Sequence, residues 1–189
     1  MKYKIGVYGS AVSEDLSIDE KARNLGQILG DFDITLITGA CTGLPYTAAS
    51  AAFKKGVEVV GFSPEKDMDG QKKFTPHDDL SIYSKINFTP KDFEYSSLPK
   101  VCQKYRNVIS TSNCDGAIII SGRWGTMNEF TNLFDMGKVI GVLTGTGGIA
   151  DELVSLFPKI NKPGKGKVIF DADPQNLVQK VLDELKLRK

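Results

Sequence analysis

Short apolar runs rich in β-branched residues alternate along this chain with longer segments whose apolar residues recur every three or four positions. The first pattern is typical of buried strands, and the second is typical of amphipathic helices that pack on them. Their alternation predicts an α/β fold, a Rossmann-like, doubly wound, mainly parallel sheet with helices on both faces. The expected strands are 3–8, 34–38, 57–62, 116–120, 139–143 and 167–170. The expected helices are 18–29, 44–55, 98–110, about 126–136, 149–156 and 174–187, with Ser17 capping the first and Gly56 closing the second.

Residues 63–95 interrupt this alternation. They are polar, contain proline and show at most one short strand, near 86–88. Irregular segments of this length inside a compact domain are usually functional flaps or mobile loops. We therefore expect a functional flap or a mobile segment here, and a partner-binding flap is a further alternative.

The composition narrows the class of protein. With 189 residues, 41% hydrophobic and 25% charged, the chain is expected to form one globular domain over 1–189. A formal net charge of +1 without a dominant basic cluster argues against a nucleic-acid partner. No apolar run approaches the ~20 residues of a membrane span, and the chain enters strand-like sequence at once, so we expect neither a membrane partner nor a signal peptide. Cys41, Cys102 and Cys114 lack CxxC spacing, which predicts reduced thiols in the cytoplasm rather than disulfides or a zinc site.

Three of the expected strands end in glycine-containing turns. In an open parallel sheet, ligands bind beyond the carboxyl ends of the strands, so these turns are expected to form one site. The alternative is that glycine is simply common in strand-to-helix turns. The turns hold Gly9 and Ser10 after the first strand, Gly39, Thr42 and Gly43 after the second, and residues 121–126 after the strand at 116–120.

The turn at 121–126 carries the strongest chemical signal. Its glycines let backbone N–H groups approach a ligand, and the helix that follows favours an anion at its N-terminus, so we expect a phosphate here. Glu129 lies one turn into that helix, where its carboxylate faces the same place. The alternative for Thr126-x-x-Glu129 is a capping box with Thr126 as N-cap. The residues of the turn are Ser121, Gly122, Arg123, Trp124, Gly125 and Thr126.

Arg106 favours a chemical role for Glu129 over simple capping. It lies on the preceding expected helix, and the end of that helix, one strand and one turn separate the two residues. Both side chains can therefore reach the same end of the sheet, which makes Arg106 and Glu129 the candidate catalytic pair.

Together these residues resemble the signature of the "lonely guy" (LOG) family, whose proteins were long labelled possible lysine decarboxylases. The family pattern is roughly Pro-Gly-Gly-x-Gly-Thr-x-x-Glu after an Arg-Lys pair on the preceding helix. Here Gly122-x-x-Gly125-Thr126-x-x-Glu129 follows Arg106 at the same spacing. Residues 38–45 are similar to a second family element, Gly-Gly-x-x-x-Gly-Leu-Met. The resemblance extends from the first strand to about residue 149.

The resemblance implies a Rossmann-like homodimer or higher homo-oligomer that binds a nucleotide or another phosphorylated small molecule. Characterised members are phosphoribohydrolases, which cleave the N-glycosidic bond of nucleoside 5′-monophosphates to a free base and ribose 5-phosphate. By this resemblance, residues 122–126 hold the 5′-phosphate. Glu129 stabilises the cationic ribosyl transition state or orients the attacking water, and Arg106 positions Glu129 and the phosphate.

The sequence departs from the family pattern at several positions. Ser121 replaces the proline, Arg123 the second glycine, Asn107 the lysine after the arginine, and Asn128 a frequent second glutamate. Arg123 either adds a charge-assisted phosphate contact or fills the space that the phosphate needs. Residues 43–46 and 145–148 look more like a branch that includes molybdenum-cofactor carrier proteins, which bind a phosphorylated pterin without turning it over. A non-catalytic nucleotide- or cofactor-binding protein, such as a carrier or sensor, is therefore the second hypothesis.

The remaining motifs favour structural explanations. Gly145-x-Gly-x-x-Ala150 formally matches a dinucleotide fingerprint, but its late position and short expected helix favour a plain glycine-rich turn. His77 lies in an expected solvated loop without a second ligand cluster, so we expect no metal, and no cofactor is expected either. Trp124 either caps the core or stacks on a ligand ring. Cys41 is expected to be a small buried residue rather than a reactive thiol.

Overall fold

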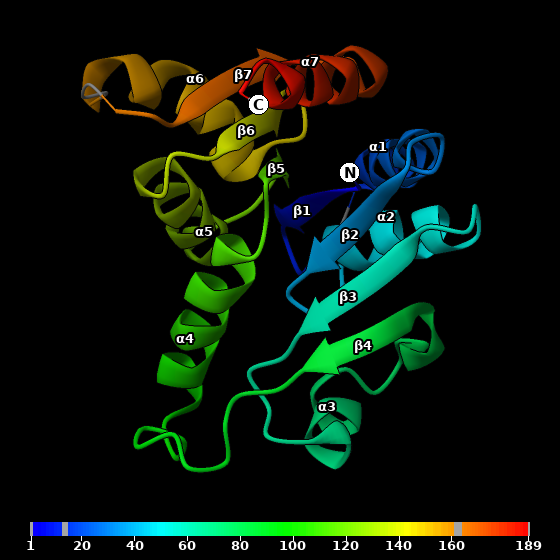
Figure 1. Cartoon of the computed structure of the whole chain (residues 1–189), viewed down its shortest axis with the longest axis vertical. Coiled ribbons are helices and arrows are strands. Elements are labelled where there is room, and N and C mark those ends of the chain that lie inside the picture. The colour runs from blue at the N-terminus through cyan, green and yellow to red at the C-terminus, as the bar shows by residue number, and fades with distance from the viewer. Residues whose placement is uncertain (1, 13–14, 161–163, 189) are drawn as a thin grey trace.

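Seven parallel strands form one sheet in the computed structural model, which describes residues 2–12, 15–160 and 164–188 (Figure 1). The strand order is β4-β3-β2-β1-β5-β6-β7, and every neighbouring pair runs parallel. This arrangement confirms the predicted Rossmann-like α/β fold. The strands are β1 (Tyr3–Gly9), β2 (Ile34–Thr38), β3 (Glu58–Phe62), β4 (Tyr83–Asn87), β5 (Gly116–Ile120), β6 (Val139–Leu143) and β7 (Lys167–Asp171).

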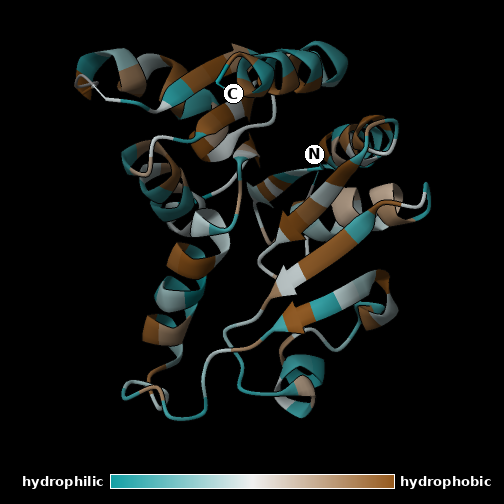
Figure 2. Ribbon diagram, in the orientation of Figure 1, coloured by the Kyte–Doolittle hydropathy of each residue, from teal (hydrophilic) through white to brown (hydrophobic). Residues whose placement is uncertain are grey.

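Helices cover both faces of the sheet. On one face lie α1 (Leu16–Leu29), α2 (Leu44–Phe53) and α7 (Pro174–Leu187), and on the other lie α4 (Pro99–Ser112), α5 (Trp124–Asp135) and α6 (Gly148–Ile160). Because both faces are covered, every residue of β2, β5 and β6 is buried. Figure 2 shows β2 as strongly hydrophobic, whereas the edge strand β4 includes hydrophilic positions. Within the described ranges, no helix combines the length and the apolar character that crossing a bilayer requires.

Most expected helix boundaries agree with the structure to within two residues, but both predicted caps are wrong. The C-cap of α2 is Lys54 rather than Gly56, because the helix ends two residues earlier than expected. α1 begins at Leu16, and its N-cap is Asp15, whose carboxylate accepts a hydrogen bond from the Ser17 N–H at 2.8 Å. Ser17 is therefore inside the helix rather than its cap, because the carboxylate upstream satisfies the free N–H groups first. α2 ends at Phe53, before the expected end at 55, and α6 continues to Ile160, beyond the expected end at 156.

The segment 63–95 is more regular than expected. It contains α3 (Met68–Phe74), a 3-10 turn (Leu80–Ile82) and β4, so the prediction of a largely irregular flap is wrong. Asp67 caps α3 by accepting from the Gly70 N–H at 2.9 Å. Gln71 is fully buried and donates from Nε2 to the Ala40 carbonyl and the Thr75 hydroxyl, both at 2.9 Å. The bond to Ala40 fastens α3 to the turn after β2.

The sheet reverses its direction of growth between β1 and β5. From β1 the chain adds β2, β3 and β4 on one side, and it then returns to place β5, β6 and β7 on the other. The carboxyl ends of β1 and β5 are therefore the topological switch point, where open α/β sheets leave a crevice for ligands.

Candidate functional site

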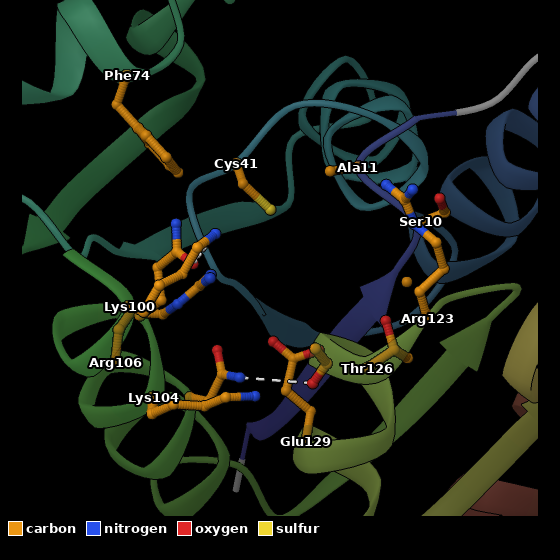
Figure 3. A pocket seen from close by; sticks show the side chains of 14 residues that line it. Ser10, Ala11, Cys41, Phe74, Lys100, Lys104, Arg106, Arg123, Thr126 and Glu129 are labelled. Atoms are coloured by element: carbon orange, nitrogen blue, oxygen red, sulfur yellow. Dashed lines mark hydrogen bonds between the residues drawn. The ribbon is translucent and has the colours of Figure 1, made fainter.

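A cavity of about 300 Å³ opens at this switch point (Figure 3). The turns after β1, β2 and β5 all reach it, as the glycine pattern predicted, and α3 and α4 complete its walls. Its lining residues are Gly9, Ser10, Ala11, Cys41, Phe74, Lys100, Gln103, Lys104, Arg106, Asn107, Arg123, Gly125, Thr126 and Glu129.

Glu129 is the buried carboxyl group of this cavity. It lies in the second turn of α5 with only 6% of its surface exposed, and Figure 3 shows its carboxylate directed into the cavity between Lys104 and Thr126. Burial raises the pKa of Glu129 from 4.5 to about 7, against the opposing effect of the Arg106 and Lys104 charges. The carboxyl group can therefore exchange a proton near neutral pH.

The structure rules out the capping-box alternative. α5 begins at Trp124 with Arg123 as its N-cap, and no side chain forms a cap hydrogen bond there. Thr126 is consequently the third residue inside the helix and cannot be its N-cap. Across the described residues, Glu129 forms no hydrogen bond or ion pair, so its carboxylate is left for the contents of the cavity.

Arg106 is held at the back of the site. Only 9% of its surface is exposed, and its Nη1 donates to the Gly39 carbonyl oxygen at 2.5 Å. A Cβ atom at Gly39 would overlap this nitrogen. The glycine therefore leaves space for the Arg106 guanidinium and not for a ligand. The buried Nε has no partner among the described residues. Arg106 and Glu129 interact electrostatically across the cavity but form no direct ion pair in the described structure.

Two departures from the LOG pattern contact each other. Asn107 donates from Nδ2 to the Asn128 side-chain oxygen at 3.0 Å and to the Gly125 carbonyl at 3.4 Å. Where the family has lysine and a frequent glutamate, this chain therefore has a neutral amide pair. The contact ties α4 to the first turn of α5.

Four cationic side chains, set against one carboxylate, give the described lining a positive charge. Arg106, Lys100 and Lys104 come from α4, and Arg123 comes from the start of α5. Arg123 is exposed, and Figure 3 places its side chain along the wall beside Ser10 and Ala11, so it does not plug the cavity. Such a lining suits an anionic ligand.

Sequence reasoning missed several of these wall residues. Lys100, Gln103, Lys104 and Asn107 recur at helical spacing on one face of α4. That spacing, read together with Arg106, was the signal that could have found them. Phe74 had no local signal, because only the position of α3 brings it to the cavity.

Other predicted site residues lie outside the cavity lining. The Ser121 N–H donates to the Thr146 hydroxyl, and the Gly122 carbonyl accepts from the Ile149 N–H, both at 2.8 Å, so this turn packs on the loop before α6. Trp124 is 82% exposed and therefore does not cap the core. Gly39 contacts Arg106, Thr42 is exposed, and Gly43 is the N-cap of α2 with φ of 88°.

The second glycine-rich loop does not present a dinucleotide cradle. The N–H groups of Gly145 and Gly147 donate to the Asp151 carboxylate at 2.6 and 2.8 Å. These are donors that a pyrophosphate would need. Elsewhere in the described chain, no group of three or more His, Cys, Asp or Glu side chains could hold a metal ion.

Comparison with known proteins gives one family and several structures of the same fold. The SLOG cluster4 family matches residues 2–178. The protein TM1055 is 19% identical over 97% of this chain and 99% of its own, with a TM-score of 0.77. The molybdenum cofactor binding protein of Rippkaea orientalis is 18% identical over 98% of both chains, with a TM-score of 0.69. No curated protein matches.

A further structure of this fold corrects one expectation from composition. DNA processing protein A of Helicobacter pylori is 18% identical over 96% of this chain and 81% of its own, with a TM-score of 0.69, and it binds single-stranded DNA. The expectation that a nucleic-acid partner is excluded is therefore wrong. A net charge of +1 describes the whole chain, whereas nucleic acid is bound by local charge, so the small total does not exclude it.

Proposed function

Because the chain belongs to the SLOG cluster4 family, in line with its resemblance to the LOG family near the molybdenum-cofactor carriers, we propose that its cavity binds a phosphorylated nucleotide-type ligand. We further propose that it cleaves the N-glycosidic bond of nucleoside 5′-monophosphates to a free base and ribose 5-phosphate. One observation carries this proposal: a buried carboxyl group, Glu129, with a pKa of about 7 inside a cation-lined cavity.

We assign the phosphate to the part of the cavity at the start of α5. Gly125 lies in the first turn of α5, where backbone N–H groups and the helix dipole favour an anion, and Arg123 lies beside it. Arg106 contributes a second guanidinium, which is largely buried in the cavity wall. These positive charges favour an anion in the cavity, because opposite charges attract strongly where the surroundings are partly buried.

Glu129 then performs the chemical step. Water attacks the anomeric carbon, the N-glycosidic bond breaks with its electron pair passing to the base, and the base takes up a proton. The Glu129 carboxylate receives the proton lost by the water and then releases it to solvent, from which the base takes its proton. The carboxylate also stabilises the positive charge that develops on the ribosyl ring. Its raised pKa suits this role, since a base is most effective near the working pH.

A second candidate is a non-catalytic carrier or sensor of a phosphorylated pterin or nucleotide. The fold match to the Rippkaea orientalis protein, which spans 98% of both chains, favours it. In that case the same cations hold the phosphate, and Glu129 binds a ring or sugar group without breaking a bond.

Release of free base from a panel of nucleoside 5′-monophosphates distinguishes the two candidates. We expect release by the wild-type protein and a loss of at least 100-fold in kcat for Glu129→Gln, because general base catalysis and charge stabilisation both depend on the carboxylate. A wild-type protein that releases no base but is still stabilised thermally by a monophosphate overturns the hydrolase and supports the carrier or sensor.

A further inference from the structure

A second hollow adjoins the cavity at the switch point. It is a groove of about 630 Å³ between α3 and the start of α4, and its volume lies within the range of small-molecule sites. Phe74 and Gln103 line both the groove and the cavity. The two spaces therefore meet at these side chains, and a ligand can extend from one into the other.

Phe74 is an aromatic side chain that the core does not use. It is half-buried, and in the described part of the chain it belongs to neither hydrophobic cluster and packs against no other aromatic ring. Figure 3 shows its side chain directed from α3 into the cavity. A large aromatic group kept at a cavity rather than in the core is typical of residues that contact a ligand.

The neighbours of Phe74 in α3 hold it in position. Gln71 and Thr75 are both buried, and the Gln71 amide donates to the Ala40 carbonyl oxygen and to the Thr75 hydroxyl, both at 2.9 Å. These contacts fix the part of α3 that carries Phe74. Its aromatic face is therefore in place before a ligand arrives, which lowers the cost of binding.

The groups of the cavity follow the order of the parts of a nucleotide. Arg123, beside which the phosphate is assigned, and Phe74 lie on opposite sides of the cavity, and Glu129 lies between them in Figure 3. In a nucleoside 5′-monophosphate the ribose likewise separates the phosphate from the base. With the phosphate at the start of α5 and the anomeric carbon at Glu129, the base extends toward Phe74 and the groove.

We propose that Phe74 stacks on the base of the nucleotide and that this base occupies the groove between α3 and α4. This proposal rests on the proposed function, because it takes the ligand to be a nucleoside 5′-monophosphate. The polar lining of the groove suits a base. Glu65 and Asp69 carry carboxylates, which accept, and Lys66 and Lys73 carry ammonium groups, which donate, whereas the edge of a nucleobase offers both donors and acceptors.

Calorimetry with ligands that have and lack a base tests this assignment. Binding of AMP, GMP, CMP, UMP and ribose 5-phosphate would be measured with full-length Glu129→Gln protein, in which we expect no bond cleavage. At least one monophosphate should bind about tenfold more tightly than ribose 5-phosphate, because stacking on an aromatic side chain contributes on this order. Adding Phe74→Leu should remove most of this difference without changing the affinity for ribose 5-phosphate. Adding Phe74→Trp, which restores an aromatic face, should preserve it.

Phe53→Leu is the matched control. Phe53 is an exposed phenylalanine at the end of α2 that lines neither the cavity nor the groove, so its replacement should change neither affinity. Equal losses for both kinds of ligand in Phe74→Leu, or no loss, would overturn the stacking by Phe74.

Two further outcomes separate this inference from the function on which it rests. If every monophosphate binds only as tightly as ribose 5-phosphate, the base site is overturned and the sugar-phosphate site stands, and this comparison needs no Phe74 variant to fold. If neither Glu129→Gln nor the wild-type protein binds any of the five compounds, the proposed function and the base site are overturned together.

Discussion

Burying the carboxylate of Glu129 lowers the free energy of unfolding, and the position of Glu129 in the cavity explains why the protein keeps it there. The group is almost fully buried, and no ion pair among the described residues compensates its charge. The folded state therefore keeps the proton up to a pH of about 7, whereas the unfolded chain releases it near the ordinary value of 4.5. Since the unfolded state loses its proton first, the contribution of Glu129 to the free energy of unfolding falls as pH rises from 4.5 to 7 and stays low above.

Glu129→Gln should consequently stabilise the protein at high pH while removing its activity. We expect the free energy of unfolding at pH 8 to exceed that of the wild type by about 3 kcal/mol, an upper limit set by the pKa shift, and the two proteins to be equal at pH 4. Urea denaturation at both pH values measures the difference. A constant difference between the two proteins at both pH values would contradict a buried, titrating carboxyl group.

Individual side chains were predicted as far as local spacing could show them. Arg106 and Glu129 were expected at one end of the sheet because the end of one helix, one strand and one turn separate them along the sequence, and both line the cavity. The start of α5 was misplaced by two residues, because the Thr126-x-x-Glu129 pattern is compatible with both a cap and a helix interior. Lys100 lies in the first turn of α4, where its charge opposes the helix dipole. That local disadvantage is itself a hint of function.

At the scale of elements, the turn after β2 and helix α4 operate as one unit. Gly39 leaves room for the guanidinium of Arg106 and accepts its hydrogen bond, so the turn determines where this cation lies. Gln71 holds the neighbouring Ala40 carbonyl from α3. The backbone after β2 is thereby fixed from two sides.

Gly39→Ala should therefore weaken ligand binding through Arg106 rather than through the fold. The new methyl group meets the far end of a flexible side chain, which moves, and we expect the affinity for ribose 5-phosphate to fall by about tenfold with little loss of stability. Calorimetry measures the affinity for ribose 5-phosphate of Gly39→Ala, of Arg106→Ala and of the double variant, and so tests whether the Gly39 effect acts through Arg106. Additive losses in the double variant would show that Gly39 acts independently of Arg106.

The types of most helices and strands were easier to predict than the regular structure of the segment 63–95. Buried strands such as β2 and β5 are apolar at every position, which makes them visible in any window. β4 is an edge strand with polar positions, and α3 has only seven residues, so neither produces a clear period. Their stability depends on contacts made elsewhere in the fold, such as the buried Gln71.

Over the whole molecule, the charge is nearly balanced, but its distribution is not. The net charge is +1, whereas the cavity gathers four cations around one carboxyl group that is largely protonated below neutral pH. Lys100, Lys104 and Arg123 are exposed, and Arg106 is buried. Salt should screen the first three much more than the last.

The affinity for ribose 5-phosphate should therefore fall with ionic strength, by about fivefold between 50 and 500 mM sodium chloride. Lys100→Ala should bind more weakly at low salt and show a shallower dependence, because a screened charge has been removed. Arg106→Ala should lose affinity at every salt concentration with an unchanged slope. Affinities that do not vary with salt would show that the exposed cations contribute nothing to binding.

The parallel sheet and its switch point were predictable because alternating strands and helices leave few other topologies. The single domain and the homodimer stay predictions. The cavity wall from α3 could not be predicted, because it depends on the packing of a short helix far from the glycine turns in sequence.

The charged residues of the cavity all come from one part of the sequence, which has a consequence for chimeras of this protein with its relatives. Residues up to 98 supply only uncharged wall, from Gly9, Ser10, Ala11, Cys41 and Phe74, and every charged lining group follows Pro99. The boundary falls in the connection between β4 and α4, outside any strand or helix. A chimera joined there would take the uncharged part of the cavity wall from one parent protein. It would take every charged lining group from the other. A single crossover could thus change the ligand that the cavity binds while the uncharged wall from β1, β2 and α3 stays the same.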